Sequence, residues 1–411
     1  MKNRLWSKNF RLLVLGQASS LFGNLILRLA LSMYVLELTG SAAVFAGILS
    51  AATVPTILLS PLGGILADRM DRRRLMVLLD LSAGSFVLAA ALLLPVIDPL
   101  AVVAGLLIAL SVLGGFETPT VQACIPAMLE GENILRGNAV VNQVASVSAL
   151  VSPMLGSALY AAFGLGPVMY ASVACFWVTA LLECFIRLAA QKKMPPSRGA
   201  LDLVRQDLAE SARFLRREQP GILKLLLLVA LANFFVMGVA VVGLPYLVRT
   251  VLGLDAVWYG GAESALAVAA ILGSAAAGLL TGRLALGQLG WVMGAVGAFL
   301  LPAGLMFLLP VGTAARYAVT VAAFCGVQAA VSIFSIFAVS AIQQRTPGQL
   351  TGKVMACVAT ITLCAQPAGQ LVYGVLFDGL RDRVWLVLAP TGVLILVITL
   401  LARGVFRELE T

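Results

Sequence analysis

Long apolar stretches separated by short polar breaks run along almost the whole chain. An α-helix needs roughly 20 mostly apolar residues to cross a bilayer, and charged or turn-forming residues end each stretch. The pattern predicts twelve membrane spans, six in each half of the chain. We place them at 10–37, 42–66, 74–95, 100–128, 134–163 and 167–189, and then at 222–249, 257–281, 289–309, 314–341, 353–377 and 384–403.

The composition is typical of a protein surrounded by lipid rather than water. Of the 411 residues, 61% are hydrophobic and only 11% are charged, whereas a soluble domain carries about 25% charged residues. We therefore expect an all-α, multi-pass protein of the cell (inner) membrane. The chain contains no His, which excludes imidazole metal sites and His proton relays, and we expect no metal and no cofactor.

The net charge of +9 would also suit a nucleic-acid-binding protein, so the positions of the basic residues matter. With twelve spans both termini lie on the same side, and all but five of the 28 Lys and Arg residues fall on that side. The exceptions are Arg28, Arg249, Arg316, Arg381 and Arg383. Because Lys and Arg are enriched in cytoplasmic loops, we expect both termini in the cytoplasm and no nucleic-acid partner.

The two halves read as an internal repeat at an offset of about 214 residues. Gly64-Ile-Leu-Ala-Asp-Arg69 aligns with Gly278-Leu-Leu-Thr-Gly-Arg283, each between the second and third span of its half, and Pro153 aligns with Pro367. Many secondary transporters are built from such repeats.

We expect bundles at 1–189 and 222–411. A linker at 190–221 would contain an amphipathic cytoplasmic helix, marked by Leu201, Val204, Leu208, Ala212 and Leu215.

The break between the second and third spans carries the most specific motif, Gly63-Gly-Ile-Leu-Ala-Asp-Arg-Met-Asp-Arg-Arg-Arg-Leu-Met76. Gly64 would let two helices approach closely. Asp68, at a helix end, could accept hydrogen bonds from Arg72 or Arg73 and face the N-terminus of a neighbouring helix. The alternative is that the Arg residues only anchor the loop in the cytoplasm.

The motif resembles the signature that the major facilitator superfamily carries between its second and third spans, except that Asp71 stands where the family usually has Gly. Stretches that begin at Phe10, Gly115 and Thr346 resemble the branch that holds the enterobactin exporter and macrolide efflux pumps. The resemblance implies twelve helices in two pseudo-symmetric six-helix bundles. It also implies a latch that holds the cytoplasmic side closed while the transporter opens outward. The latch residues would be Gly64, Asp68, Arg69, Arg72 and Arg73.

Two departures from the drug-antiporter pattern of this superfamily bear on mechanism. Span four has no basic residue between Leu110 and Gly115, where many proton-driven antiporters carry an Arg. The Gly-Pro-x-x-Gly-Gly motif of span five appears only as Ser152-Pro-Met-Leu-Gly-Ser157. A standard drug/proton antiport mechanism therefore does not follow from the resemblance. The proline still removes a backbone hydrogen bond, so we expect kinks at Pro153, with Gly156 beside it, and at Pro367.

Ionisable residues within a span are costly and are therefore functional candidates. Glu117, in the inner half of span four, is the leading candidate for a protonatable coupling carboxylate. Asp80 is the second candidate, although a salt link to the basic loop at Arg74 is the simpler interpretation. We expect Glu183 to pair with Arg187, four residues later, along one helix face.

The remaining polar groups at helix depth would either touch a solute or hold helices together. A cation at Arg28, one turn above Asn24, would suit an anionic or polar solute, and the alternative is an ion pair with a buried carboxylate. The cavity candidates are Asn24, Arg28, Gln143, Asn233, Gln328 and Gln366.

No phosphate-binding loop, nucleophile elbow or zinc-binding helix motif occurs in the chain, so we expect neither an enzyme nor an ATP-driven pump. The leading hypothesis is a monomeric secondary active transporter that exports a drug-like or siderophore-like small molecule, with protons as the coupling ion. Uptake by symport and lipid translocation are alternatives within the class. A non-transporting membrane receptor or scaffold is the alternative from another class.

Overall fold

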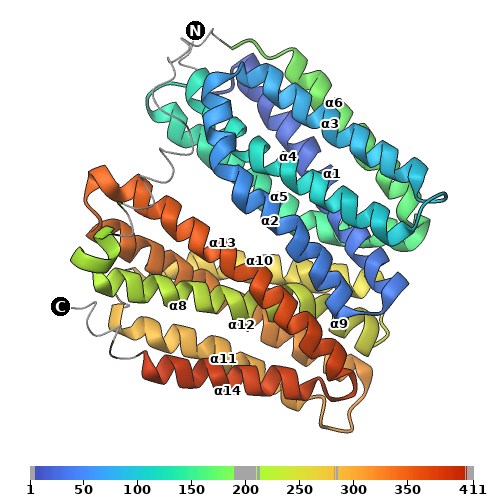
Figure 1. Ribbon diagram of the computed structural model, residues 1–411, viewed down its shortest axis with the longest axis vertical. Helices are drawn as coiled ribbons and strands as arrows, with labels where there is room; N and C mark the ends of the chain where they lie inside the picture. Colours follow the sequence, from blue (N-terminus) through green and yellow to red (C-terminus); the bar gives the residue numbers. More distant parts are fainter. Residues whose placement is uncertain are drawn as a thin grey trace. The chain divides into compact units, whose positions relative to one another are not determined.

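Helices make up nearly all of the chain in the computed structural model (Figure 1), which describes residues 5–188, 210, 213–281, 283, 286–402 and 404, without the side chains of 60–69, 218, 286, 348–349 and 351. No strand occurs in these residues. The first half contains α1 (Lys8–Thr39), α2 (Ala42–Arg69), α3 (Arg72–Leu93), α4 (Pro99–Met128), α5 (Glu132–Phe163) and α6 (Leu165–Cys184). The second half contains α8 (Pro220–Val236), α10 (Ala256–Leu280), α11 (Leu289–Leu305), α12 (Thr313–Arg345), α13 (Gly348–Gly379) and α14 (Trp385–Leu401).

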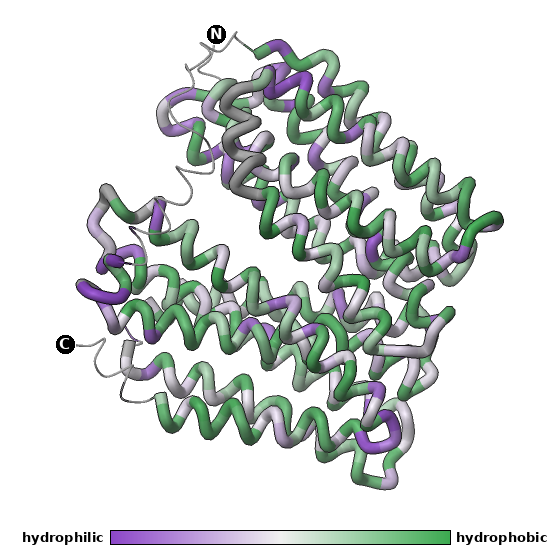
Figure 2. The backbone as a smooth tube through the Cα atoms, in the orientation of Figure 1, coloured by the Kyte–Doolittle hydropathy of each residue, from purple (hydrophilic) through white to green (hydrophobic). Residues whose placement is uncertain are grey.

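Each of the twelve predicted spans coincides with an apolar helix. Ten helical segments in the described part of the chain are long and apolar enough to cross a membrane, and α11 and α14 are shorter apolar helices of 17 residues each. Figure 2 shows hydrophobic residues along the helices and hydrophilic residues mainly at helix ends and loops. The span prediction is therefore confirmed at the level of helices.

Short local sequences explain several helix ends. Asp98 accepts a hydrogen bond from the backbone N–H of Ala101 at 2.9 Å and so caps the start of α4. Pro99 follows at the first helical position, where its fixed φ angle suits a helix. Gly164, between α5 and α6, has a φ of +76°, which only glycine adopts at little cost. These residues place the breaks where the hydrophobic pattern predicts them.

Span seven is not one regular helix. After α8 the chain forms π-helical turns at Met237–Gly243 (η2) and Leu247–Val251 (η3), on either side of Leu244–Tyr246 (α9). Pro245 lacks the N–H that an α-helical turn would use. A Cβ on Gly238 would lie 2.3 Å from the Tyr373 ring, and one on Gly243 would lie 2.6 Å from the Phe377 ring. The widened turns therefore pack directly against aromatic side chains of α13.

The chain divides into two compact units. The first comprises Met1–Thr39, Ala51–Ala200 and Asp255–Ser264, and the second comprises Gly40–Ser50, Leu201–Leu254 and Ala265–Thr411. Most of the predicted linker lies outside the described residues, so the boundaries at 189/190 and 221/222 stay predictions. The last turn of that segment (η1, Phe214–Glu218) is described, and Phe214 and Leu215 are buried in an apolar cluster of the second unit with Ile222 and Leu226.

Three pairs of equivalent helices pack in both units, as the repeat predicts. α3 packs on α6, α3 on α4 and α1 on α5, and the counterparts α11 on α14, α11 on α12 and α8 on α13 also pack. Small residues allow two of these contacts: a Cβ on Gly84 of α3 would lie 2.5 Å from the Trp177 ring of α6, and one on Gly297 of α11 would lie 2.5 Å from the Gly392 carbonyl of α14. Lipid provides no hydrophobic driving force for helices to associate, so close packing of this kind holds the helices together instead.

Candidate functional site

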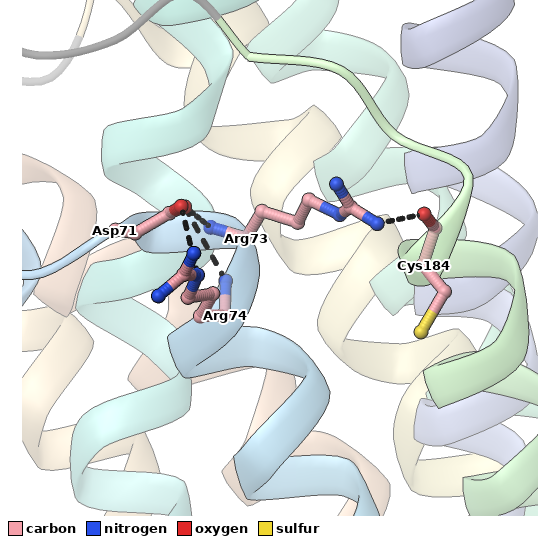
Figure 3. Close-up of polar contacts among 4 residues, drawn as sticks. All are labelled: Asp71, Arg73, Arg74 and Cys184. Atoms are coloured by element: carbon pink, nitrogen blue, oxygen red, sulfur yellow. Dashed lines mark hydrogen bonds and ion pairs between the residues drawn. The ribbon is translucent and has the colours of Figure 1, made fainter.

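The start of α3 contains the described part of the predicted latch motif. Asp71 is the N-cap of this helix, and its carboxylate accepts hydrogen bonds from the backbone N–H groups of Arg73 at 3.1 Å and Arg74 at 3.4 Å. The Arg74 Nε lies 3.5 Å from the Asp71 carboxylate. Figure 3 shows these contacts. An acidic N-cap is a favourable helix start, which explains an Asp at a position where the family usually has Gly.

Two arginines connect this turn to neighbouring helices. The Arg72 guanidinium donates to the Ala123 carbonyl of α4 at 2.8 Å, and the Arg73 guanidinium donates to the Cys184 carbonyl at the end of α6 (Figure 3). The Cys184 carbonyl lies at the C-terminus of α6, where carbonyl groups lack helical partners and a cation is stabilising. Gly64, Asp68 and Arg69 lie outside the residues whose side chains are described, so their part in the latch stays a prediction.

Three carboxyl groups from three helices lie together with a serine hydroxyl from a fourth, inside the first unit. The Ser20 Oγ of α1 is 3.0 Å from the Asp80 Oδ1 of α3 and 3.4 Å from the Glu117 Oε1 of α4. The carboxyl groups of Asp80 and Glu183, the latter on α6, interact with each other electrostatically. Asp80 is 2% exposed and Glu183 1%, whereas Glu117 is half-buried. We call Asp80, Glu117 and Glu183 the carboxyl cluster.

The cluster overturns two expectations from the sequence. Glu183 does not pair with Arg187 on a helix face, because α6 ends at Cys184 and Glu183 is buried while Arg187 is exposed. Asp80 does not form the simple salt link to Arg74, which pairs with Asp71 instead. The structure thus brings both predicted coupling candidates, Asp80 and Glu117, into one site and adds Glu183, which sequence reasoning had assigned to the surface.

Arg28 lies near the same cluster and is held by neutral groups. Its Nε donates to the Asn24 side-chain oxygen at 3.1 Å, and its Nη2 donates to the Ser111 hydroxyl of α4 at 3.2 Å. Glu117 interacts with it electrostatically. The direct contacts of this guanidinium within the bundle are therefore neutral, unlike the ion pair considered as the alternative for Arg28.

A cavity of about 350 Å³ lies within the second unit. The predicted cavity residues Asn233, on α8, and Gln328, on α12, both line it. Its other polar lining residues are Ser274, Ser332 and Ser335. Apolar side chains such as Val236 and Phe334 complete the wall, and no charged residue lines it. A mostly apolar pocket with a few amide and hydroxyl groups suits an amphipathic organic molecule.

The other predicted site residues have different surroundings. Gln143 is exposed on α5, and Gln366 is half-buried on α13. The helices continue through Pro153 and Pro367, and the kinks stay predictions. A Cβ on Gly156 would lie 3.2 Å from the Ile26 backbone of α1, so this glycine permits a close approach of α5 to α1.

Two residues of α13 that the sequence did not single out hold the first part of α2 within the second unit. The Asp378 carboxylate accepts from the backbone N–H groups of Ala42 at 2.7 Å and Ala43 at 3.0 Å, and from the Ser41 hydroxyl. Further along α2, the Ser50 hydroxyl donates a hydrogen bond to the Gln370 amide oxygen at 3.3 Å. Asp378 therefore caps a helix that is distant in sequence. In the sequence, the feature that could have singled out Asp378 is its position as an acidic residue at the end of an apolar span.

These sites can bind protons and polar organic groups. Among the described residues, no three or more His, Cys, Asp or Glu side chains lie close enough together to hold a metal ion. The carboxyl cluster offers oxygen atoms that can take up or release protons within the bundle, and the cavity offers hydrogen-bonding groups without charge.

Comparisons with known proteins agree with this architecture. The sequence model of the Major Facilitator Superfamily matches residues 13–369. Macrolide efflux protein A of Streptococcus pyogenes is 25% identical over 424 residues, which cover 98% of this chain and 98% of that protein. A nucleoside transporter, NupG, superposes with a TM-score of 0.73 at 13% identity, over 96% of this chain and 99% of that one. A bacterial homologue of the iron transporter ferroportin, in an inward-facing state, gives 0.72 at 18% identity, over 98% of each chain. At these identities the structural likeness shows the fold alone.

Proposed function

The chain belongs to the Major Facilitator Superfamily and is a transporter, and we propose that it exports a small amphipathic organic compound in exchange for protons. The observation that carries the proposal is the match to macrolide efflux protein A along almost the full length of both chains. It favours export over uptake by symport or lipid translocation. It also makes a macrolide the first substrate to test.

The cavity in the second unit supports this substrate class. Its lining combines the Asn233 and Gln328 amides with serine hydroxyls and an apolar wall, which fits a solute that carries several hydrogen-bonding groups on an apolar frame. We propose that Asn24 and Arg28 also bind the solute, and that the solute crosses the membrane by alternating access.

The proposed coupling ion is the proton, with Glu117 and Asp80 as its binding groups. A charged carboxylate within a membrane span is costly, and two such groups here share the Ser20 hydroxyl. Neutralising them with protons removes part of that cost, so proton binding can be linked to a change of conformation. The latch residues Gly64, Asp68, Arg69, Arg72 and Arg73 would act on the cytoplasmic side. We further propose a monomer in the cell membrane, with both termini in the cytoplasm.

Uptake of a labelled macrolide into respiring everted membrane vesicles tests the proposal. In such vesicles the pumped proton gradient drives an exporter to load substrate into the lumen. We expect accumulation that a protonophore abolishes and that is absent from vesicles without the protein. If a broad panel of macrolides, other drugs and siderophores shows no gradient-dependent accumulation, export is refuted. Accumulation only in right-side-out vesicles would favour uptake.

A further inference from the structure

Glu183 is the least expected member of the carboxyl cluster. It lies at the C-terminal end of α6 but is only 1% exposed. One of its oxygens, Oε2, has no hydrogen-bond partner within the described structure. A charged, unpaired carboxylate in such surroundings would be very unfavourable, and two ionised carboxyl groups that interact within a bundle, as those of Asp80 and Glu183 would, repel each other. Glu183 therefore has the surroundings of a group that holds a proton.

The charges that face the cluster do not balance it. The four packed helices contribute Arg28 from α1, Asp80 from α3, Glu117 and the Cys124 thiol from α4, and Glu183 with the neighbouring Cys184 thiol from α6. Arg28 is the cation that acts on Glu117, and its direct contacts are Asn24 and Ser111. At the end of the bundle near Glu183, the Arg72 and Arg73 guanidinium groups of α3 donate to the backbone carbonyls of Ala123 and Cys184. Three carboxylates beside one guanidinium would leave an uncompensated charge of two inside a bundle, and like charges at such a site cannot all ionise together.

A buried polar group outside the three acids also lies beside the cluster. The Gln17 amide of α1 is 6% exposed, and its Nε2 has no partner within the described structure. Gln17 lies three residues before Ser20, on the same helical face, and next to Gly16, where a Cβ would lie 3.9 Å from the Glu183 side chain. An unpaired donor on α1 and an unpaired acceptor on Glu183 thus flank the cluster.

We propose that Asp80 and Glu183 form a proton-sharing pair, and that the Ser20 hydroxyl relays a proton between this pair and Glu117. The inference rests on the proton coupling proposed above and adds a third acid and a route. With two protons on the three carboxyl groups, the remaining negative charge lies either on Glu117, near Arg28, or on the pair.

The relay step conserves protons. When Glu117 is ionised, the Ser20 O–H bond breaks as its proton forms a bond to the Glu117 Oε1, and the Ser20 oxygen takes a proton from the Asp80 carboxyl group. The negative charge then rests on the pair, whose remaining proton is shared by Asp80 and Glu183. Because Glu117 is half-buried and the pair is buried, we assign the exchange of protons with water to Glu117.

The purified protein in liposomes tests the relay with matched variants and a labelled macrolide as the probe. Glu183→Gln removes the shared acid and Glu183→Asp keeps it, while Ser20→Ala removes the hydroxyl and Ser20→Thr keeps it. We expect Glu183→Gln and Ser20→Ala to lose about tenfold or more of the accumulation driven by a pH gradient. Exchange of labelled for unlabelled macrolide needs no net proton movement and should persist, which also shows that the variants are folded. Glu183→Asp and Ser20→Thr should retain gradient-driven accumulation.

Infrared spectroscopy gives a test that needs no substrate. The wild-type protein should show the absorption of a protonated carboxyl group at neutral pH, and this signal should fall in Glu183→Gln but not in the exposed-loop control Glu130→Gln. Wild-type-like accumulation by both Glu183→Gln and Ser20→Ala, or no protonated-carboxyl signal in the wild type, would overturn the relay. If the wild type shows no gradient-driven transport while the infrared signal is present, the export proposal fails and the proton-sharing pair stands.

Discussion

At the scale of single residues, Ser20 matters because one hydroxyl hydrogen faces two carboxyl acceptors. Its Oγ is within 3.4 Å of both Asp80 and Glu117, and it can donate to only one of them at a time. The choice is coupled to protonation, since a hydroxyl donates to a carboxylate and can accept from a carboxylic acid. A small polar residue can thus connect two titrating groups without adding a charge to the bundle.

The cavity amides give a residue-scale prediction about substrate recognition. Asn233→Ala and Gln328→Ala should each raise the KM for macrolide exchange about fivefold, because losing one hydrogen bond to a neutral group costs about 1 kcal/mol. The maximal exchange rate should change little. Gln143→Ala is the matched control, since Gln143 is an exposed amide that does not line the cavity. If all three variants had the KM of the wild type, the cavity would be excluded as the binding site.

Some of the site residues could be predicted from the sequence and others could not. Glu117 and Asp80 were predictable because any acid within an apolar stretch stands out, whatever its neighbours. Glu183 was misplaced because the spacing to Arg187 assumes a helix through both residues, whereas α6 ends at Cys184. Asn233 and Gln328 were predicted separately, and nothing in the spacing of α8 and α12 indicated that they line the same cavity.

At the scale of helices, the start of α2 depends on a carboxylate that is 336 residues away in sequence. Asp378→Ala removes the acceptor for two backbone N–H groups and should lower the free energy of unfolding by about 1 kcal/mol, as loss of an N-cap does. Thermal unfolding of the purified protein in detergent measures the change. Asp378→Asn keeps an acceptor oxygen and should lose less. Equal unfolding temperatures for the wild type and the Ala variant would contradict the role of Asp378 as a cap.

The contact of α11 with α14 gives a second helix-scale prediction. Gly297→Ala would place a Cβ 2.5 Å from the Gly392 carbonyl and should destabilise the protein by about 1–3 kcal/mol, because the two backbones must separate. Gly294→Ala, one turn earlier on the same helix, meets only an ordinary contact at 3.5 Å and should be neutral or slightly stabilising. The difference in unfolding temperature between the two variants is the measurement, and no difference would exclude close packing at Gly297.

Span seven shows the limit of hydrophobic patterning for a whole helix. Its apolar residues predict a single span at 222–249, and the chain does run as consecutive helical turns there, but η2 and η3 widen it. Gly238, Gly243 and Pro245 were visible in the sequence, yet glycine and proline are common in membrane helices. The aromatic rings of α13 that occupy the space beside the glycines come from a distant segment.

At the scale of the whole molecule, the charge bias predicts the sidedness of every loop. In a variant without the six native Cys, a membrane-impermeant thiol reagent added to intact cells should label Val96→Cys, between α3 and α4. It should label Glu130→Cys, between α4 and α5, only after the cells are permeabilised. Both positions are exposed. The reverse pattern would show that the termini lie outside the cytoplasm and that the Lys and Arg bias does not set the topology.

The sequence by itself determined the number of apolar helices, their approximate ends and the family, because hydrophobic length, turn residues and the loop motif are local properties of the chain. It also indicated the repeat, since equivalent segments keep similar patterns. Only the tertiary structure decided which side chains meet. The contacts of Ser20 with Asp80 and Glu117, of Glu183 with Asp80 and of Asp378 with the start of α2 depend on how each helix is rotated and packed against partners far away in sequence. No short-range pattern specifies that rotation, because in lipid it is set by small residues and polar contacts between helices.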